Sequence, residues 1–178
     1  MYFLINFLTI SRIILAVVIF ILLSLPDKYL YALLLFIFAG ISDYFDGYLA
    51  RKHGMTSDIG EILDPIADKI LISFVLIGLA LNLSSYILGF SAAIIISREI
   101  WISGLRDLNS RKNNIDATKV TFLAKIKTTI QLFTIFMYLV ALTFEVMILI
   151  VISDILIVIA MLITVYTGYI YTINSVYE

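Results

Sequence analysis

Long apolar stretches constrain this chain more than any other feature of its sequence. A helix that crosses a bilayer needs about 20 apolar residues, and six stretches of that size, separated by short polar breaks, nearly exhaust the 178 residues. They fall at about residues 3–25, 29–52, 58–82, 86–107, 120–143 and 147–171. Only 14% of the residues are charged, against about 25% in soluble domains. We therefore predict an all-α, polytopic membrane protein with six transmembrane helices, formed by residues 1–178 as a single domain.

Basic residues predict how these helices are oriented. Arg51 and Lys52 flank the second connection, and the fourth connection, residues 109–119, holds three more basic residues. The connections at the opposite ends hold only Lys28. Because basic connections stay on the cytoplasmic side, both termini are predicted to be cytoplasmic. Residues 1–25 lack a basic leader and a small-residue cleavage site, so we expect them to remain as the first helix.

Four aspartates interrupt the second and third stretches in the pattern D-x-x-D-G-x-x-A-R-x8-G-x3-D-x3-D. Asp43 and Asp46 are spaced i,i+3, and Asp64 and Asp68 are spaced i,i+4, so each pair lies on one side of a helix. A short connection makes the two helices antiparallel neighbours, and the pairs can then face each other. An ionised group at the bilayer centre costs about 2.5–3.5 kcal/mol, so four of them need cations or water.

Convergent carboxylates are the ligands that hard divalent ions such as Mg²⁺ prefer, and bound Mg²⁺ attracts phosphates. We therefore predict two divalent ions that bridge a pyrophosphate. Helix caps and interfacial charges would explain one aspartate, but not four with Gly47, Arg51 and Gly60 between them. Arg51 offers a planar fork for phosphate or a pyrimidine carbonyl. The small residues Gly47, Ala50 and Gly60 let a ligand approach the backbone, although close helix packing alone would also explain each glycine.

The run from Asp43 to Asp68 resembles the defining motif of the CDP-alcohol phosphotransferase family, with every specified position present. The resemblance implies a six-helix membrane enzyme, usually a homodimer, that moves a phosphatidyl or similar group from a CDP-linked donor to an alcohol. It implies that two Mg²⁺ or Mn²⁺ ions are bound by Asp43, Asp46, Asp64 and Asp68. Asp68 would also be the catalytic base. The CDP-binding residues would be Asp43, Asp46, Gly47, Ala50, Arg51 and Gly60.

Basic residues in the second half of the chain point to the acceptor. Arg98 and Arg106 lie in the fourth stretch, and Lys125 and Lys127 begin the fifth. Cations on the cytoplasmic half of neighbouring helices would form a basic pocket that suits a phosphorylated acceptor. Snorkelling to lipid headgroups is the alternative, mainly for Lys127. Glu99 is expected to pair with one of these cations.

These segments resemble the bacterial phosphatidylglycerophosphate synthases, in which R-E-x3-S-x-L-R and G-K-x-K-T-x2-Q runs recur. Residues 63–69 and the stripe Asn6-x2-Thr9-x2-Arg12 extend the resemblance over nearly the whole chain, although Ala124 stands where glycine is usual. The resemblance implies transfer of a phosphatidyl group from CDP-diacylglycerol to glycerol-3-phosphate, at the cytoplasmic face of a bacterial-type inner membrane. The products would be phosphatidylglycerophosphate and CMP, and the basic residues named above would bind the acceptor phosphate.

Two other readings remain open from the sequence. A sister enzyme would use another acceptor, as cardiolipin synthases or inositol-phosphate and serine transferases do. A divalent-cation carrier would use the aspartates as a pathway, but carriers continue their polar residues across the membrane, often in repeated halves. Here the acids cluster at one side and no repeat is evident. The net charge of −1 gives no reason to expect nucleic acid as a partner.

Overall fold

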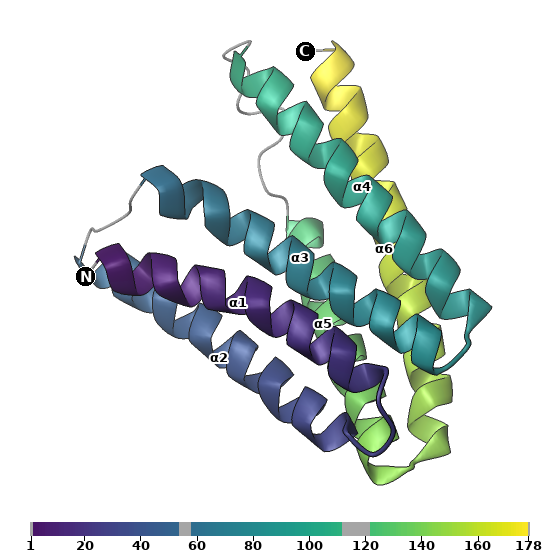
Figure 1. The fold of residues 1–178 in the computed structure, drawn as a ribbon. Coiled ribbons are helices and arrows are strands. Elements are labelled where there is room, and N and C mark those ends of the chain that lie inside the picture. Colours follow the sequence, from purple (N-terminus) through teal and green to yellow (C-terminus); the bar gives the residue numbers. More distant parts are fainter. Residues whose placement is uncertain (1, 54–57, 112–121, 178) are drawn as a thin grey trace.

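The computed structural model describes residues 2–53, 58–111 and 122–177, and within them the side chains of residues 9–43, 63–111 and 122–175. The α-helix is the only regular secondary structure among the described residues (Figure 1). Their bounds are α1 Tyr2–Leu23, α2 Tyr29–His53, α3 Asp58–Asn82, α4 Tyr86–Arg111, α5 Phe122–Phe144 and α6 Met147–Tyr177. The prediction of an all-helical chain with six helices is thereby confirmed for the part of the chain that the structure describes.

Two helices run further than the sequence predicts. α4 continues to Arg111 and α6 to Tyr177, beyond the expected ends at residues 107 and 171. Asn109 and Ser175 explain the extension, because the Asn109 amide donates a hydrogen bond to Ser175 Oγ at 2.7 Å and both side chains are buried. Polar residues that look like a loop in sequence thus pair with each other across two helices.

The number of membrane spans is confirmed in part. By length and composition, three of the described helices can cross a membrane, namely α4, α5 and the segment Met147–Ser175 of α6. The apolar parts of α1 and α2 among the described residues are shorter, at Thr9–Leu23 and Tyr29–Asp43. Six spans and a cytoplasmic location of the termini stay predictions.

The helices pack as two groups of three. α1 packs against α2 and α3, whereas α6 packs against α4 and α5. Contacts of α3 with α4 and of α2 with α5 join the groups. Figure 1 shows α4 and α6 running side by side, with α5 behind α3. Both helices that carry motif aspartates, α2 and α3, therefore contact the second group, and α3 contacts both α4 and α5.

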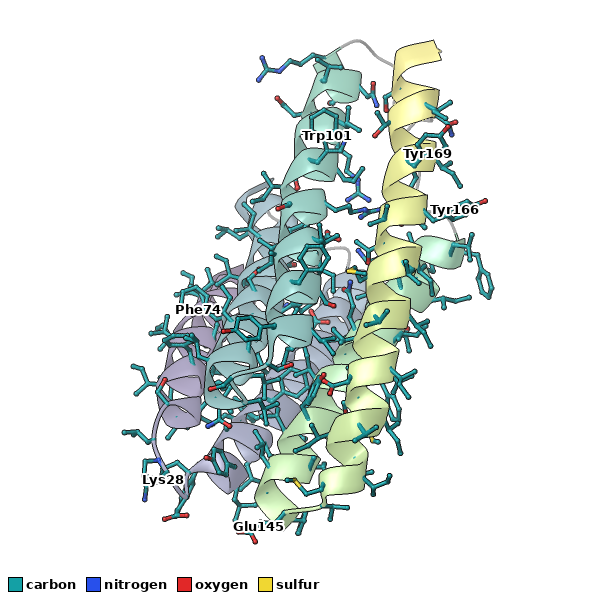
Figure 2. All side chains as sticks on the ribbon, turned by 90° about the vertical axis from the view of Figure 1, so that its right-hand side faces the viewer. Lys28, Phe74, Trp101, Glu145, Tyr166 and Tyr169 are labelled. Carbon is teal, nitrogen blue, oxygen red and sulfur yellow. The ribbon has the colours of Figure 1, made fainter. Side chains whose placement is uncertain are left out.

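Three tight turns join consecutive helices at the end of the bundle away from the motif. Asp27, Ser84 and Glu145 each adopt a left-handed backbone there, with φ of 59°, 48° and 56°, a conformation that commonly ends helices. The Asn82 amide donates hydrogen bonds to the Leu23 carbonyl at 2.8 Å and to the Tyr29 hydroxyl at 3.1 Å, which ties the first two turns together. Lys28 and Glu145 lie at this end in Figure 2.

The interior is apolar and closely packed. At Gly78 a Cβ atom would lie 3.0 Å from Leu23 Cδ1 and 3.2 Å from Phe20 Cδ2, so this glycine lets α1 and α3 approach each other. The outer surface is also apolar, with exposed side chains such as Ile14, Ile155 and Phe74 (Figure 2). An apolar exterior around a bundle of long helices suits a lipid environment.

Candidate functional site

Among the described side chains, three motif aspartates converge on one arginine. Arg12 Nη1 on α1 donates to Asp43 Oδ1 and to Asp68 Oδ1, each at 2.6 Å. Its Nη2 donates to Asp64 Oδ1 at 3.1 Å, and Thr9 Oγ1 donates to the same oxygen at 2.5 Å. The fold therefore brings together one aspartate from α2 and two from α3.

The arginine and the carboxylates differ sharply in exposure. The Arg12 side chain is 1% exposed, whereas those of Asp43, Asp64 and Asp68 are 52%, 41% and 48% exposed. Arg12 thus reaches the carboxylates from the protein interior, and their other side remains accessible. Packing of α1 against both α2 and α3 places the arginine at this position.

The remaining motif residues lie on the same two helices. Asp46, Gly47, Ala50 and Arg51 belong to α2, and Gly60 belongs to α3. Their side chains lie outside the described residues. The CDP-binding assignment, and the fourth aspartate of the metal assignment, therefore stay predictions.

The donor set at the aspartates suits a divalent metal ion. Carboxylate oxygens are the ligands of Mg²⁺ and Mn²⁺. The hydrogen bonds that the described residues donate to Asp43, Asp64 and Asp68 all go to Oδ1, and none of these donors reaches Oδ2. The same residues contain no ready-made group of three acidic side chains around a single ion position. The fourth predicted ligand, Asp46, is not part of this set, because its side chain lies outside the described residues.

A cavity of about 240 Å³ lies beside Asp68, between α3, α4, α5 and α6. Its charged lining residues are Asp68, Lys69, Arg98, Glu99, Arg106 and Lys127. Four basic side chains thus face two acidic ones, and the cavity carries a net positive charge. Such a cavity suits a small anion next to the last motif aspartate.

Ion pairs and an aromatic ring hold the buried cations of this cavity. Glu99 Oε1 accepts a hydrogen bond from Arg98 Nη1 at 3.1 Å and another from Lys127 Nζ. The side chains of Arg98 and Lys127 are only 9% and 5% exposed. Arg98 Nη2 also donates to Thr167 Oγ1 at 2.9 Å, and its guanidinium lies 5.5 Å from the centre of the Tyr171 ring. The expected pairing of Glu99 is present, with two cations rather than one.

Two further contacts fix the wall of the cavity. At Gly168 on α6, a Cβ atom would lie 3.0 Å from Arg98 Cγ and 3.3 Å from Arg98 Nε, so Arg98 needs a glycine there. Lys69 Nζ donates to Ser103 Oγ, which donates to the Glu99 carbonyl at 2.8 Å. Lys69 therefore links α3, directly after Asp68, to α4.

The structure divides the four predicted acceptor residues. Arg98, Arg106 and Lys127 line the cavity, whereas Lys125 is exposed and does not line it. Lys125 and Lys127 are two positions apart on α5, and residues at that spacing do not face the same way. A contact between Lys125 and the acceptor stays a prediction.

Arg12, Thr9 and Lys69 are site residues that the sequence analysis did not assign. The signal for Arg12 was present, because a charged residue inside an apolar helix is usually functional or paired. Thr9 lies one turn before Arg12 and shares its face of α1. Their partners are distant in sequence, so the contacts of Arg12 and Thr9 with the motif aspartates could not be predicted from the sequence.

The chain is similar in sequence to a family of known transferases. A family model described as CDP-alcohol phosphatidyltransferase matches residues 2–166. A curated relative from Pectobacterium atrosepticum, named CDP-diacylglycerol–glycerol-3-phosphate 3-phosphatidyltransferase, is 38% identical over 58% of this chain and 57% of its own length. Relatives of the same name from Sodalis glossinidius and Rickettsia bellii are 37% and 35% identical. These alignments cover 61% and 93% of this chain, and 60% and 91% of the relatives.

The chain thus spans less than two thirds of the first two relatives and nearly all of the third. The family match covers the aspartate motif, Arg12 and most of the lining of the basic cavity. It argues against the cation-carrier alternative, because the matched family is one of transferases. The chain belongs to the CDP-alcohol phosphatidyltransferase family.

Proposed function

We propose that this chain transfers the phosphatidyl group of CDP-diacylglycerol to sn-glycerol-3-phosphate, giving phosphatidylglycerophosphate and CMP. The observation that carries the choice of acceptor is the basic cavity, in which Asp68 lies together with Arg98, Arg106 and Lys127. The names of the relatives describe the same reaction and support the proposal.

A phosphorylated acceptor fits this cavity for an electrostatic reason. Arg98 and Lys127 are buried cations whose charge is balanced in the described structure mainly by Glu99. A phosphate group would accept charge-assisted hydrogen bonds from them, each worth about 1.5–3 kcal/mol. An acceptor without a phosphate would leave these cations without that interaction. The hydroxyl of a phosphate-anchored glycerol would then lie toward Asp68, on the α3 side of the cavity.

The transfer itself is a displacement at phosphorus. The acceptor hydroxyl oxygen forms a bond to the β-phosphorus of CDP-diacylglycerol, and Asp68 accepts the hydroxyl proton. The bond from that phosphorus to the bridging oxygen breaks, and its electron pair leaves with CMP. Divalent Mg²⁺ or Mn²⁺ ions, held by Asp43, Asp46, Asp64 and Asp68, would neutralise charge on the phosphates. Gly47, Ala50, Arg51 and Gly60 are proposed to shape the pocket for the CDP group.

The topology follows from the same proposal. We place all six helices across a bacterial-type inner membrane, with both termini and the active site on the cytoplasmic side, where the water-soluble acceptor is available. Basic residues at the motif end of the bundle support this orientation. We also propose that the enzyme is a homodimer, as the family resemblance implies.

A transfer assay tests the function. Purified protein is incubated with CDP-diacylglycerol, Mg²⁺ or Mn²⁺ and radiolabelled glycerol-3-phosphate, and both CMP release and lipid labelling are followed. We expect labelled lipid that is lost with a chelator and in Asp68→Asn. CMP release only with phosphatidylglycerol or inositol phosphate would keep the reaction class and refute the acceptor. No CMP release with any alcohol would refute the transferase proposal.

A further inference from the structure

We propose that Arg12 is a positioning residue for the metal site. From the buried side it holds one oxygen of each of Asp43, Asp64 and Asp68, and thereby directs the other oxygen toward the accessible side, where a divalent ion binds. This inference rests on the proposed role of these aspartates as metal ligands.

The hydrogen bonds support positioning by a single side chain. One nitrogen, Arg12 Nη1, is shared between an aspartate of α2 and an aspartate of α3 at 2.6 Å each, and Nη2 reaches a second aspartate of α3 at 3.1 Å. The planar guanidinium fork fixes the direction of each bond. A lysine ammonium carries the same charge on a compact group and cannot reproduce this fork.

The distribution of exposure supports the same conclusion. Arg12 is 1% exposed beneath carboxylates that are 41% to 52% exposed, so an ion from solution would approach from the opposite side. The ion would meet Oδ2 oxygens, which receive no hydrogen bond among the described residues. Arg12 therefore need not leave for an ion to bind.

The net charge of the site separates positioning from a simple charge effect, because the two predict different changes in cation binding. Three carboxylates and one guanidinium carry a net charge of −2, which still attracts a divalent ion (−3 + 1 = −2). Charge alone would predict that loss of Arg12 strengthens cation binding, because like charges repel. In Arg12→Lys the charge is kept, so charge alone predicts unchanged binding there. Positioning predicts weaker binding, because carboxylates that repel one another and lack the guanidinium fork would turn apart. Weaker binding is thus a result that the charge effect cannot produce.

Thr9 provides a second, uncharged anchor. Its hydroxyl donates to the Asp64 oxygen that also accepts from Arg12, at 2.5 Å. Both residues are fully buried on α1. Thr9→Val removes the hydroxyl with little change in shape and leaves Arg12 in place.

The experiment measures Mn²⁺ binding to the purified full chain by electron paramagnetic resonance, without lipid or nucleotide. The variants are Arg12→Lys, which keeps the charge and loses the fork, and Thr9→Val. The control is Arg111→Lys, because Arg111 is a 77% exposed residue whose ion pair is with Asp107 at 2.9 Å. Loss of a hydrogen bond that holds a metal ligand in place typically weakens metal binding about 10- to 100-fold. We expect about tenfold weaker binding in Arg12→Lys, a smaller loss in Thr9→Val, and no change in the control.

A second readout separates positioning from a purely structural role. In the transfer assay, the Mn²⁺ concentration for half-maximal activity should rise in Arg12→Lys while the KM for glycerol-3-phosphate stays the same. Equal or tighter Mn²⁺ binding in a folded Arg12→Lys protein would overturn the inference and leave the proposed function intact. If Arg12→Lys does not fold, unchanged binding in Thr9→Val would overturn it. A wild-type protein that binds no Mn²⁺ would refute the metal site and this inference together.

Discussion

At the scale of single residues, the bundle gives polar side chains within its apolar helices specific partners. Asp154 on α6 has no partner that the sequence identifies, yet the structure places the Tyr138 hydroxyl of α5 2.6 Å from its Oδ1. Tyr138 itself is fully buried. Buried polar groups that lose their partner are costly, because nothing else replaces the hydrogen bond. This pair therefore contributes to the stability of the α5–α6 hairpin.

Tyr138→Phe should destabilise the protein by about 1.5–3 kcal/mol, the usual contribution of a hydrogen bond to a charged group. The acceptor KM should not change, because Tyr138 and Lys127 are separated by about 16 Å along α5. Thermal melting in detergent and steady-state kinetics measure the two effects. Tyr166→Phe is the control, since Tyr166 is 56% exposed. An equal fall in Tm for both variants would argue against the pair.

The sequence predicted some residue contacts and missed others for a physical reason. Glu99 was expected to pair with a cation because four basic residues lie in the same two stretches of the chain. Arg12 was noted only as part of a polar stripe, because its partners Asp43 and Asp68 are 31 and 56 positions away. Contacts at such separations depend on helix packing, which the local pattern does not encode.

At the scale of helices, the seam between α4 and α6 shapes the basic cavity. Trp101 Nε1 donates to Thr172 Oγ1 at 2.9 Å along this seam, and Arg98 crosses it to reach Thr167. Trp101 and Tyr169 lie on these two helices in Figure 2. Gly168 provides the space in which the Arg98 side chain lies. The position of Arg98 thus depends on the absence of a side chain on the neighbouring helix.

Gly168→Ala should displace Arg98, because its new methyl group would lie 3.0 Å from Arg98 Cγ. Such overpacking typically costs about 1–3 kcal/mol. We expect a lower Tm and a higher KM for glycerol-3-phosphate. Gly104→Ala is the matched control, because no atom lies within 4 Å of a Cβ placed there, and alanine favours the helix. If the two variants show the same acceptor KM, Gly168 does not control the position of Arg98.

The helix bounds were largely predictable, because apolar stretches and polar breaks alternate clearly along the chain. The largest errors are at the ends of α4 and α6, where Asn109 and Ser175 are polar and yet buried against each other. The spacing of the aspartates was enough to predict that each pair lies on one side of a single helix. The lining of the cavity was readable only in part, since Lys125 and Lys127 share a segment and face different ways.

At the scale of the whole molecule, two groups of three helices enclose the proposed chemistry between them. α3 carries Asp64 and Asp68 at its motif end and meets α4, which carries Arg98 and Arg106. The proposed metal ligands thus lie on helices of the first group, and the proposed acceptor cations lie on helices of the second. A reaction that joins two substrates suits a site built at such a junction.

The proposed orientation can be tested with single cysteines, because the chain contains no cysteine of its own. Glu145→Cys lies at a tight turn of the bundle, whereas Arg111→Cys lies at the other end, at the exposed end of α4. In intact cells, a membrane-impermeant thiol reagent should label position 145 directly. It should label position 111 only after the membrane is permeabilised. The opposite pattern would place the active site outside the cell and contradict the proposed topology.

The central claim is that the basic cavity binds the phosphate of the acceptor. The most direct test is the KM for glycerol-3-phosphate in Lys127→Gln, with Lys125→Gln as the matched variant two positions away. Lys127 is 5% exposed and lines the cavity, whereas Lys125 is exposed and does not. Loss of one charge-assisted hydrogen bond of about 1.5–3 kcal/mol corresponds to a rise in acceptor KM of at least about tenfold. We predict that rise in Lys127→Gln, a much smaller one in Lys125→Gln, and an unchanged KM for CDP-diacylglycerol in both. An unchanged acceptor KM in folded Lys127→Gln, or an equal rise in both variants, would contradict the claim.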